Sequence, residues 1–277
     1  MIHLVVDSGA DINEEIVNSE NCTLSCVPLN LQVENTVYID DENLDKKKYL
    51  EHFESVPTAV KTSAPSPSLF IDKFKFGDSV LVVTLSSKLS ATYQSALSAK
   101  DMYIEEYGKK FIHVFDSLTA AMGEGAVAMK IADLARIGAR APEIVEQVNE
   151  YIKNMRTFFI LDKFDNLVKT GRVKPYVAKI ASVLNVKPIC TAFEGELKML
   201  DKSRGFPKAM NRLIEIIKNE VPDIQNRVIG ITHVEAYEKA VAMRDALLQL
   251  CPKEIKIIEC KGITTTYANR GGIVLAL

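Results

Sequence analysis

The chain has 277 residues, of which 47% are hydrophobic and 25% are charged, so it has enough apolar material for a large core and is not mainly disordered. Its 34 basic and 36 acidic residues give a formal charge of −2, which argues against a nucleic-acid binder, because that function needs a basic excess. No apolar run approaches the roughly 20 residues that cross a bilayer, and no signal peptide is evident. We therefore expect a cytoplasmic protein without a membrane span. Its length predicts one large domain or two domains of ordinary size.

The first half of the chain alternates predicted strands with predicted helices. Strands are expected at residues 3–6, 22–33 with an interruption at Pro28, 80–85 and 111–115, and helices at 44–53, 68–74 and 90–107. The run at 80–85 reads VLVVTL, which is typical of a strand buried on both faces. This β-α-β order predicts a Rossmann-like α/β domain with a parallel sheet covered by helices.

The segment 118–137 reads LTAAMGEGAVAMKIADLARI and is apolar on most of its circumference, so it predicts a buried helix. A central core helix is the simplest interpretation. The alternative is that its small and flexible residues line a cavity for an apolar ligand, and Met122, Ala126 and Met129 are the candidates for that wall.

The second half begins after a helix at 143–156. Strands are expected at residues 158–161, 187–193, 196–200, 227–232, 254–260 and 272–277, and helices at 176–184, 206–219 and 236–250. Glu194-Gly195 is a hairpin signal between two of these strands. A hairpin combined with helices predicts an α/β domain with a mixed sheet. We place the two domains at residues 1–155 and 156–277.

Hydroxyl groups follow the predicted strands of the first half. Asp7-Ser8, Ser86-Ser87 and Asp116-Ser117 each come at a strand end, where the loops of a parallel sheet meet at one edge and bind ligands. Helix capping is the alternative for such residues, and it suits Asp116-Ser117 best. Ser86 and Ser87 supply more hydroxyl groups than one helix cap requires. In KTSAPSPS, at residues 61–68, capping likewise does not explain Thr62 and Ser63.

Familiar enzyme patterns are missing from the sequence. It has no glycine-rich nucleotide motif and no G-x-S-x-G elbow, and its five cysteines and four histidines show no metal-ligand spacing. We therefore expect no cofactor, no metal and no catalytic residue. An edge of neutral hydroxyl donors suits the binding of an anionic head group better than catalysis. Arg172 and Arg204 could each offer a guanidinium fork to a phosphate or carboxylate.

Several strings, taken in order, resemble the DegV family of bacterial fatty-acid-binding proteins over nearly the whole chain. They are VVDSGADI, TSAPSPS, LSSKLSATYQSA, FDSLTAAMGEG, LDKFDNLVKTGR, VKPI and EGELKMLDKSRGFPKA, followed by a C-terminal strand that contains glycine. The resemblance implies two α/β domains with one long-chain fatty acid buried between them. It also implies a binding protein, not an enzyme, that presents the fatty acid to a separate ATP-dependent fatty acid kinase.

The resemblance assigns roles to individual residues. It places Thr62 and Ser87 on the carboxylate, with Ser63 and Ser86 beside them, and it matches Arg172 and Arg204 to basic positions that would face a partner or a phosphate. The family's last motif usually carries a histidine, whereas this chain has Tyr267 there. We predict that Tyr267 replaces the histidine as a head-group donor; the alternative is a packing residue.

Two other functions stay open at this point. An acyl or phosphoryl transferase could use the same hydroxyl-rich edge. The protein could also carry a different anionic amphiphile.

Overall fold

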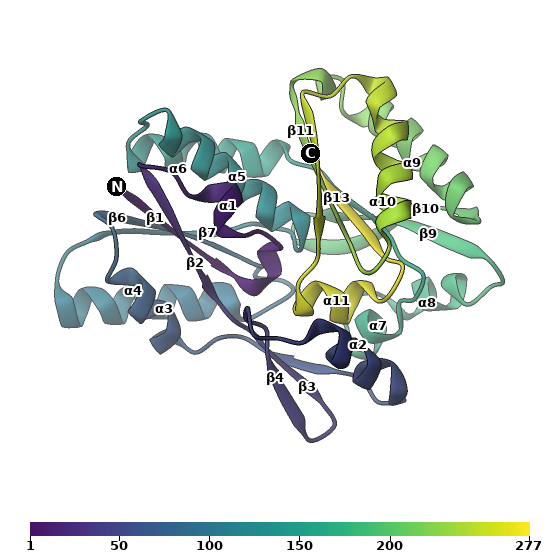
Figure 1. The fold of residues 1–277 in the computed structure, drawn as a ribbon, viewed down its shortest axis with the longest axis horizontal. Helices are drawn as coiled ribbons and strands as arrows, with labels where there is room; N and C mark the ends of the chain where they lie inside the picture. Colours follow the sequence, from purple (N-terminus) through teal and green to yellow (C-terminus); the bar gives the residue numbers. More distant parts are fainter.

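The structure is a computed structural model that describes all residues from 1 to 277, and it contains three β-sheets with helices around them (Figure 1). The first sheet is parallel and has the strand order β2-β1-β6-β7. Its strands are β1 (Ile2–Asp7), β2 (Cys22–Val27), β6 (Ser79–Thr84) and β7 (Phe111–Asp116). The predicted parallel sheet is thus confirmed.

Helices cover both faces of this sheet. The helices packed on one face are α3 (Pro67–Phe74) and α4 (Thr92–Tyr107), and those on the other are α1 (Glu14–Val17), α5 (Met122–Arg136) and α6 (Ala141–Asn154). Side chains of a strand alternate between its faces, so Val80 and Val82 of β6 contact the first group while Leu81 and Val83 contact the second. This double burial explains why the strand is a continuous apolar run.

The second large sheet is mixed and has the order β10-β9-β8-β13-β11-β12. Its strands are β8 (Thr157–Ile160), β9 (Val186–Phe193), β10 (Glu196–Arg204), β11 (Val228–His233), β12 (Glu254–Glu259) and β13 (Ile273–Ala276). Only β11 and β12 pair in parallel. The hairpin predicted at Glu194-Gly195 joins β9 to β10, and both turn residues have positive φ. The predicted mixed sheet is confirmed.

Two layers of helices cover the second sheet as well. The helices on one face are α9 (Phe206–Glu220) and α10 (Tyr237–Leu247), and those on the other are α7 (Asp165–Lys169), α8 (Pro175–Ala181) and α11 (Gly262–Ala268). Short 3-10 turns complete the chain at η1 (Ser8–Ala10), η2 (Ile224–Asn226) and η3 (Leu248–Leu250). No signal in the sequence had predicted α11.

A third, small antiparallel sheet was also not predicted. It has the order β4-β3-β5 and consists of β3 (Asn30–Val33), β4 (Thr36–Ile39) and β5 (Lys61–Ser63), with α2 (Lys46–Ser55) packed beside it. The strand expected at 22–33 is interrupted at Pro28 as predicted, but its two parts, β2 and β3, belong to different sheets, which was not predicted. Pro28 lies between β2 and β3 and cannot donate a ladder hydrogen bond, so the chain leaves one sheet there and enters another.

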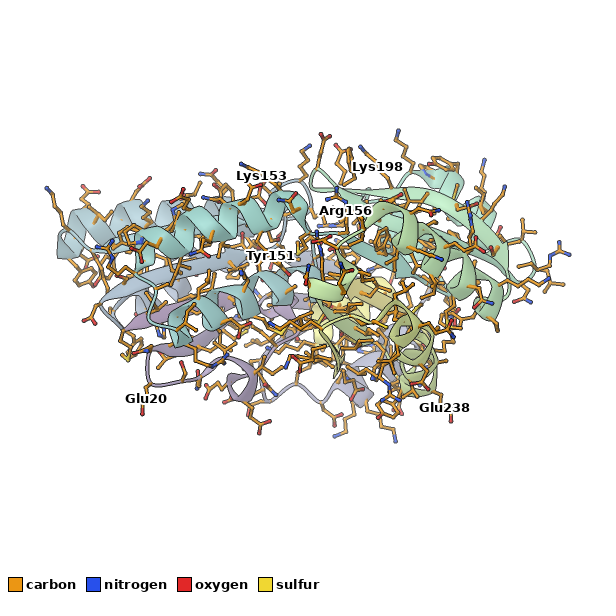
Figure 2. The ribbon with its side chains drawn as sticks, turned by 90° about the horizontal axis from the view of Figure 1, so that it is seen from above. Glu20, Tyr151, Lys153, Arg156, Lys198 and Glu238 are labelled. Carbon is orange, nitrogen blue, oxygen red and sulfur yellow. The ribbon has the colours of Figure 1, made fainter.

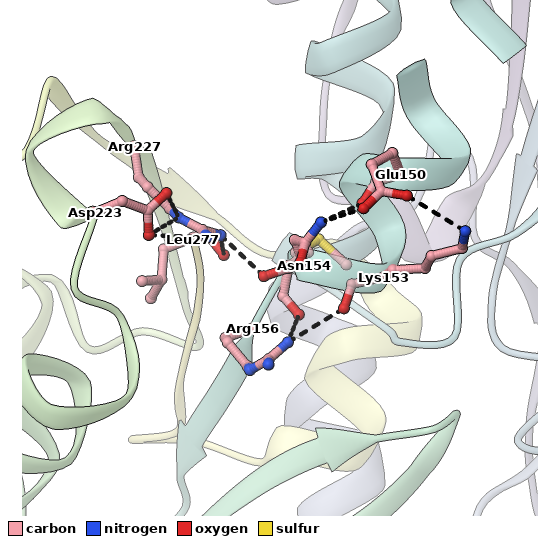
Figure 3. A network of polar contacts seen from close by, with 8 residues as sticks. Glu150, Lys153, Asn154, Arg156, Asp223, Arg227 and Leu277 are labelled. Carbon is pink, nitrogen blue, oxygen red and sulfur yellow. Dashed lines mark hydrogen bonds and ion pairs between the residues drawn. The ribbon is translucent and has the colours of Figure 1, made fainter. Parts of the chain in front are cut away.

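The two large sheets meet where α6 ends and β8 begins. Figure 2 shows Tyr151, Lys153 and Arg156 at this junction, between the half that carries Glu20 and the half that carries Glu238. Arg227 ties the junction together, because its guanidinium pairs with Asp223 and donates to the carbonyl oxygen of Asn154 at 2.9 Å (Figure 3).

The hydrophobic core is not divided between the two halves of the sequence. Leu31, Tyr49 and Phe53 from the first half pack in one cluster with Phe159 and Val274 from the second. The domains at residues 1–155 and 156–277 therefore stay a prediction, although the chain does pass between the large sheets near residue 155.

Candidate functional site

A narrow apolar cavity lies within the cluster that both halves share. Twenty residues line it, of which 14 are hydrophobic. Its empty space adds up to about 740 Å³, including the part open to solvent, but only about 90 Å³ can hold the centre of a water molecule. A cavity of this shape suits a thin flexible chain better than a compact polar ligand.

Strand β8 shows how the cavity is elongated. Thr157, Phe159 and Leu161 all line it, because alternate residues of a strand share one face. At about 3.3 Å per residue, these positions span about 13 Å. Leu161 is followed along the chain by α7. We call the Thr157 end the deep end, because Thr157 and its neighbour Thr119 are buried whereas Thr62 and Tyr267 are partly exposed.

The end near α11 carries a pair of hydroxyl groups. Thr62 on β5 and Tyr267 on α11 both line the cavity, and their side-chain oxygens lie 2.8 Å apart. Asn166 ties the two elements together, because it accepts from the backbone N–H of Val60 and donates to the carbonyl of Thr266. The structure thus brings together two of the residues that were predicted to hold a carboxylate.

A positive charge lies at the same end. Arg172 lines the cavity, and its guanidinium carbon lies 5.0 Å from the centre of the Tyr267 ring. The guanidinium donates to the carbonyl oxygens of Leu89 and Thr170, and it forms no ion pair. Its charge is therefore available to an anion in the cavity.

The other predicted hydroxyls lie elsewhere. Ser63 follows Thr62 in β5, so its side chain points to the opposite face of the strand, where it accepts a hydrogen bond from Asn30. Ser86 is fully buried and donates to the carbonyl of Gly195 at 2.8 Å. Ser87 is exposed. None of these three lines the cavity, whereas Ser90 of the same loop does.

The remaining predicted positions also lie away from the cavity. Met122, Ala126 and Met129 pack in one core cluster with β1 and α6, and α5 also contacts β11 and β13 of the second sheet, but none of the three residues lines the cavity. The simpler interpretation of this segment, a core helix, therefore holds, and the residues just before it, Ala120 and Ala121, line the cavity instead. Arg204 is exposed at the end of β10.

The deep end of the cavity holds a second hydroxyl pair. Thr119 and Thr157 are both buried, and Thr119 Oγ1 donates to Thr157 Oγ1 at 2.9 Å. These residues bind each other across the junction between the halves. The cavity is thus apolar in its middle and carries hydroxyl groups at both ends.

Several carboxyl groups are buried near α11. Burial raises the pKa of Asp7 to about 6 and that of Asp11 to about 7, and it also raises the pKa of Asp40. Asp7 accepts from the backbone N–H groups of Gly9 and Leu85, so it organises the loop after β1. No cluster of His, Cys, Asp and Glu side chains is arranged to hold a metal ion.

Sequence reasoning missed α11, which supplies four residues of the cavity: Ile263, Thr264, Tyr267 and Ala268. Its sequence, GITTTYA, is short, begins with glycine and is rich in β-branched threonine, so the local sequence does not indicate a helix. A bilayer-spanning helix is absent, since every helix of the protein is too short or too polar for that role.

The comparisons with known proteins indicate one family over the whole chain. A family described as uncharacterised proteins of the DegV family matches residues 1–277. A DegV domain-containing protein of Streptococcus pyogenes serotype M1 is 31% identical over 274 residues, which cover 98% of this chain and 97% of that protein.

Two solved structures are similar throughout. A DegV family protein from Ruminococcus gnavus, refined with vaccenic acid, has a TM-score of 0.94 and 33% identity and covers 100% of this chain and 99% of its own. The Fatty Acid Kinase B3 protein of Streptococcus pneumoniae, loaded with linoleic acid, has a TM-score of 0.94 and 28% identity, with 99% and 98% coverage.

Proposed function

The chain belongs to the DegV family, and we propose that it binds one long-chain fatty acid in the cavity between its two large sheets. One observation carries the proposal: a narrow apolar cavity ends at the Thr62–Tyr267 hydroxyl pair, beside a guanidinium that has no carboxylate partner. The similar proteins that hold vaccenic acid and linoleic acid support it.

The carboxylate of the fatty acid occupies the end near α11. Thr62 and Tyr267 supply hydroxyl donors, Arg172 supplies a positive charge, and Ser90 lies within the same lining. Hydrogen bonds to a charged group contribute roughly 1.5–3 kcal/mol each. The acyl chain occupies the apolar middle, where each buried CH₂ contributes about 0.8 kcal/mol.

The protein itself is a carrier in this proposal. It presents the carboxylate to a separate fatty acid kinase, where a carboxylate oxygen attacks the γ-phosphorus of ATP and ADP leaves. The kinase-related protein of Streptococcus pneumoniae among the similar structures supports such a partner. Because the partner uses ATP, the presentation step belongs in the cytoplasm.

Mass spectrometry of lipid extracted from gently purified protein tests the proposal. We expect a long-chain fatty acid, and we expect the delipidated protein to rebind palmitic acid in calorimetric titration. A protein that carries no lipid and binds no added fatty acid would refute the function. A co-purified nucleotide or sugar phosphate would favour a transferase instead.

An assay of acyl-phosphate formation tests the carrier role. With ATP and palmitic acid, the protein alone should form no acyl-phosphate, and formation should require both the protein and a fatty acid kinase. Acyl-phosphate made by the protein alone would show that it is an enzyme.

A further inference from the structure

Two buried carboxylates from the first half of the chain hold the beginning of α11. Asp40 accepts from the backbone N–H groups of Gly262 and Ile263, each at 2.8 Å. Asp11 accepts from the N–H group of Lys261 at 2.7 Å. Both carboxylates are at least 98% buried. Three consecutive N–H groups at the start of α11 therefore have acceptors that lie more than 220 residues away in the sequence.

This arrangement replaces ordinary helix capping. The first N–H groups of a helix have no partners within the helix, and a neighbouring Ser, Thr, Asn or Asp side chain usually accepts from them. Here the N-cap residue is Lys261, whose side chain makes no capping hydrogen bond. A helix of seven residues is too short to be stable by itself. The position of α11 therefore depends on Asp11, Asp40 and its other tertiary contacts.

The helix held in this way carries part of the candidate site. Ile263 of the first turn and Tyr267, four residues later, lie on the same side of α11, and both line the cavity. The Tyr267 hydroxyl meets Thr62 at 2.8 Å. A shift of about 1 Å at the first turn would move this hydroxyl out of hydrogen-bond distance.

We propose that Asp11 and Asp40 are positioning residues that place the Tyr267 hydroxyl at the head-group end of the cavity by holding the first turn of α11. The proposal rests on the proposed fatty-acid function. Burial of a carboxylate is costly unless partners compensate it, and the three N–H groups supply partners for both oxygens of Asp40 and for one oxygen of Asp11.

A second set of contacts holds the same helix from α2. Lys46 donates to the carbonyl of Cys260, and the Tyr49 hydroxyl lies within hydrogen-bond distance of Thr266 Oγ1. These contacts remain when a carboxylate is changed, so the helix should stay folded in the variants while its first turn shifts.

A double-mutant cycle tests the proposal. The four proteins are the wild type, Asp40→Asn, Tyr267→Phe and the double variant, and the measurement is the Kd for palmitic acid. We expect Asp40→Asn to weaken binding about tenfold in the wild type and to have little further effect in Tyr267→Phe, since residues that act through one another are not additive. An equal loss in both backgrounds, or no loss at all, would overturn the proposal.

The control is Asp45→Asn. Asp45 caps α2 by accepting from the N–H of Lys48, but it is exposed and does not contact α11. It therefore places the same change from carboxylate to amide at the beginning of another helix. We expect it to leave the Kd unchanged. A tenfold loss in this variant would show that the effect of Asp40→Asn is not specific to α11.

A spectroscopic readout separates positioning from loss of stability. The chain has nine tyrosines, and in protein labelled with 3-fluorotyrosine the ¹⁹F resonance of Tyr267 is the one missing from Tyr267→Phe. We expect Asp40→Asn to shift this resonance and Asp45→Asn to leave it in place. An unshifted resonance in folded Asp40→Asn would contradict the proposal.

Two further outcomes each have a defined consequence for the proposal. If Asp40→Asn does not fold, Asp11→Ala removes the one acceptor of the Lys261 N–H and should give the same coupling with a smaller loss; additivity there would overturn the proposal. If the wild type does not bind palmitic acid, the proposed function fails and the positioning role falls with it. Binding by the wild type with an additive cycle refutes the positioning role alone.

Discussion

The hydroxyl oxygens of Thr62 and Tyr267 lie 2.8 Å apart, although 205 residues separate them in the sequence. A hydroxyl group has one proton to donate. One member of the pair therefore donates to the other, and the second proton is free for a ligand in the cavity. Arg172, stacked over the Tyr267 ring, adds a charge that attracts an anion to this proton.

Tyr267→Phe keeps the ring and deletes one hydroxyl. We expect about a tenfold weaker Kd for palmitic acid, at the lower end of the value of a hydrogen bond to a charged group, because Thr62 can still donate. Melting temperature and affinity of Tyr267→Phe and Tyr267→Ala distinguish this role from packing. An unchanged affinity in Tyr267→Phe, with stability lost only in Tyr267→Ala, would make Tyr267 a packing residue.

Arg172→Ala removes the only positive charge that lines the cavity. The resemblance to the family had assigned this residue to a partner or a phosphate, but its place beside Tyr267 leads us to expect a loss of fatty-acid affinity of about tenfold or more. Arg204→Ala is the matched control, since Arg204 is exposed and lies outside the cavity. Equal affinities of the two variants would return Arg172 to the partner-facing role.

Ser86→Ala and Ser87→Ala should differ in stability. Loss of the Ser86 hydroxyl leaves the carbonyl of Gly195 without its partner, which should lower the free energy of unfolding by about 1–3 kcal/mol. Ser87 is exposed, so its change should stay within about 0.5 kcal/mol. Urea denaturation measures both. A large loss of fatty-acid affinity in Ser87→Ala would instead support the carboxylate role that the family resemblance assigns to it.

A change at the Thr119–Thr157 pair, at the deep end of the cavity, is expected to strengthen fatty-acid binding. Replacing both residues by valine keeps their shape and removes a hydrogen-bonded pair together, which is nearly neutral for stability. An acyl chain would then meet an apolar wall, so we expect palmitic acid to bind a few-fold more tightly. Thr157→Val alone takes the acceptor from Thr119 and should lower the melting temperature. Weaker binding by the double variant would show that the hydroxyls contact the ligand.

Asp11→Asn should change how stability depends on pH. Burial raises the pKa of Asp11 from its ordinary value of 3.8 to about 7, so the folded protein binds this proton more tightly than the unfolded chain does. Its contribution to stability is then fully present below about pH 4 and is lost as the pH rises to about 7. The wild type should therefore gain stability relative to Asp11→Asn as the pH falls from 7 to 4. Urea denaturation across this range measures the difference, and a constant difference would contradict the expectation.

Local patterns in the sequence were enough for most of the two large sheets. The run at residues 80–85 predicted a strand with both faces buried, and Glu194-Gly195 predicted the hairpin between β9 and β10. Both signals are local, because a buried strand needs continuous apolar residues and a tight turn needs positive φ. The family strings added the expectation of a fatty acid between two domains, and the cavity lies within the core that the two halves share.

Long-range contacts decided the rest of the site. Nothing local predicts α11, because its first N–H groups find their acceptors on Asp11 and Asp40. Nor could the sequence separate Thr62 from Ser63, since which of two neighbouring strand residues faces a cavity depends on how the strand is placed.

The sequence by itself therefore determined the class of fold, the order of its main elements and the kind of side chain available to a ligand, because these follow from hydrophobic period, turn residues and composition. Only the tertiary structure decided which hydroxyl groups meet. Thr62 and Tyr267 are brought together by a small sheet and a short helix, and both are held in place by contacts between distant parts of the chain.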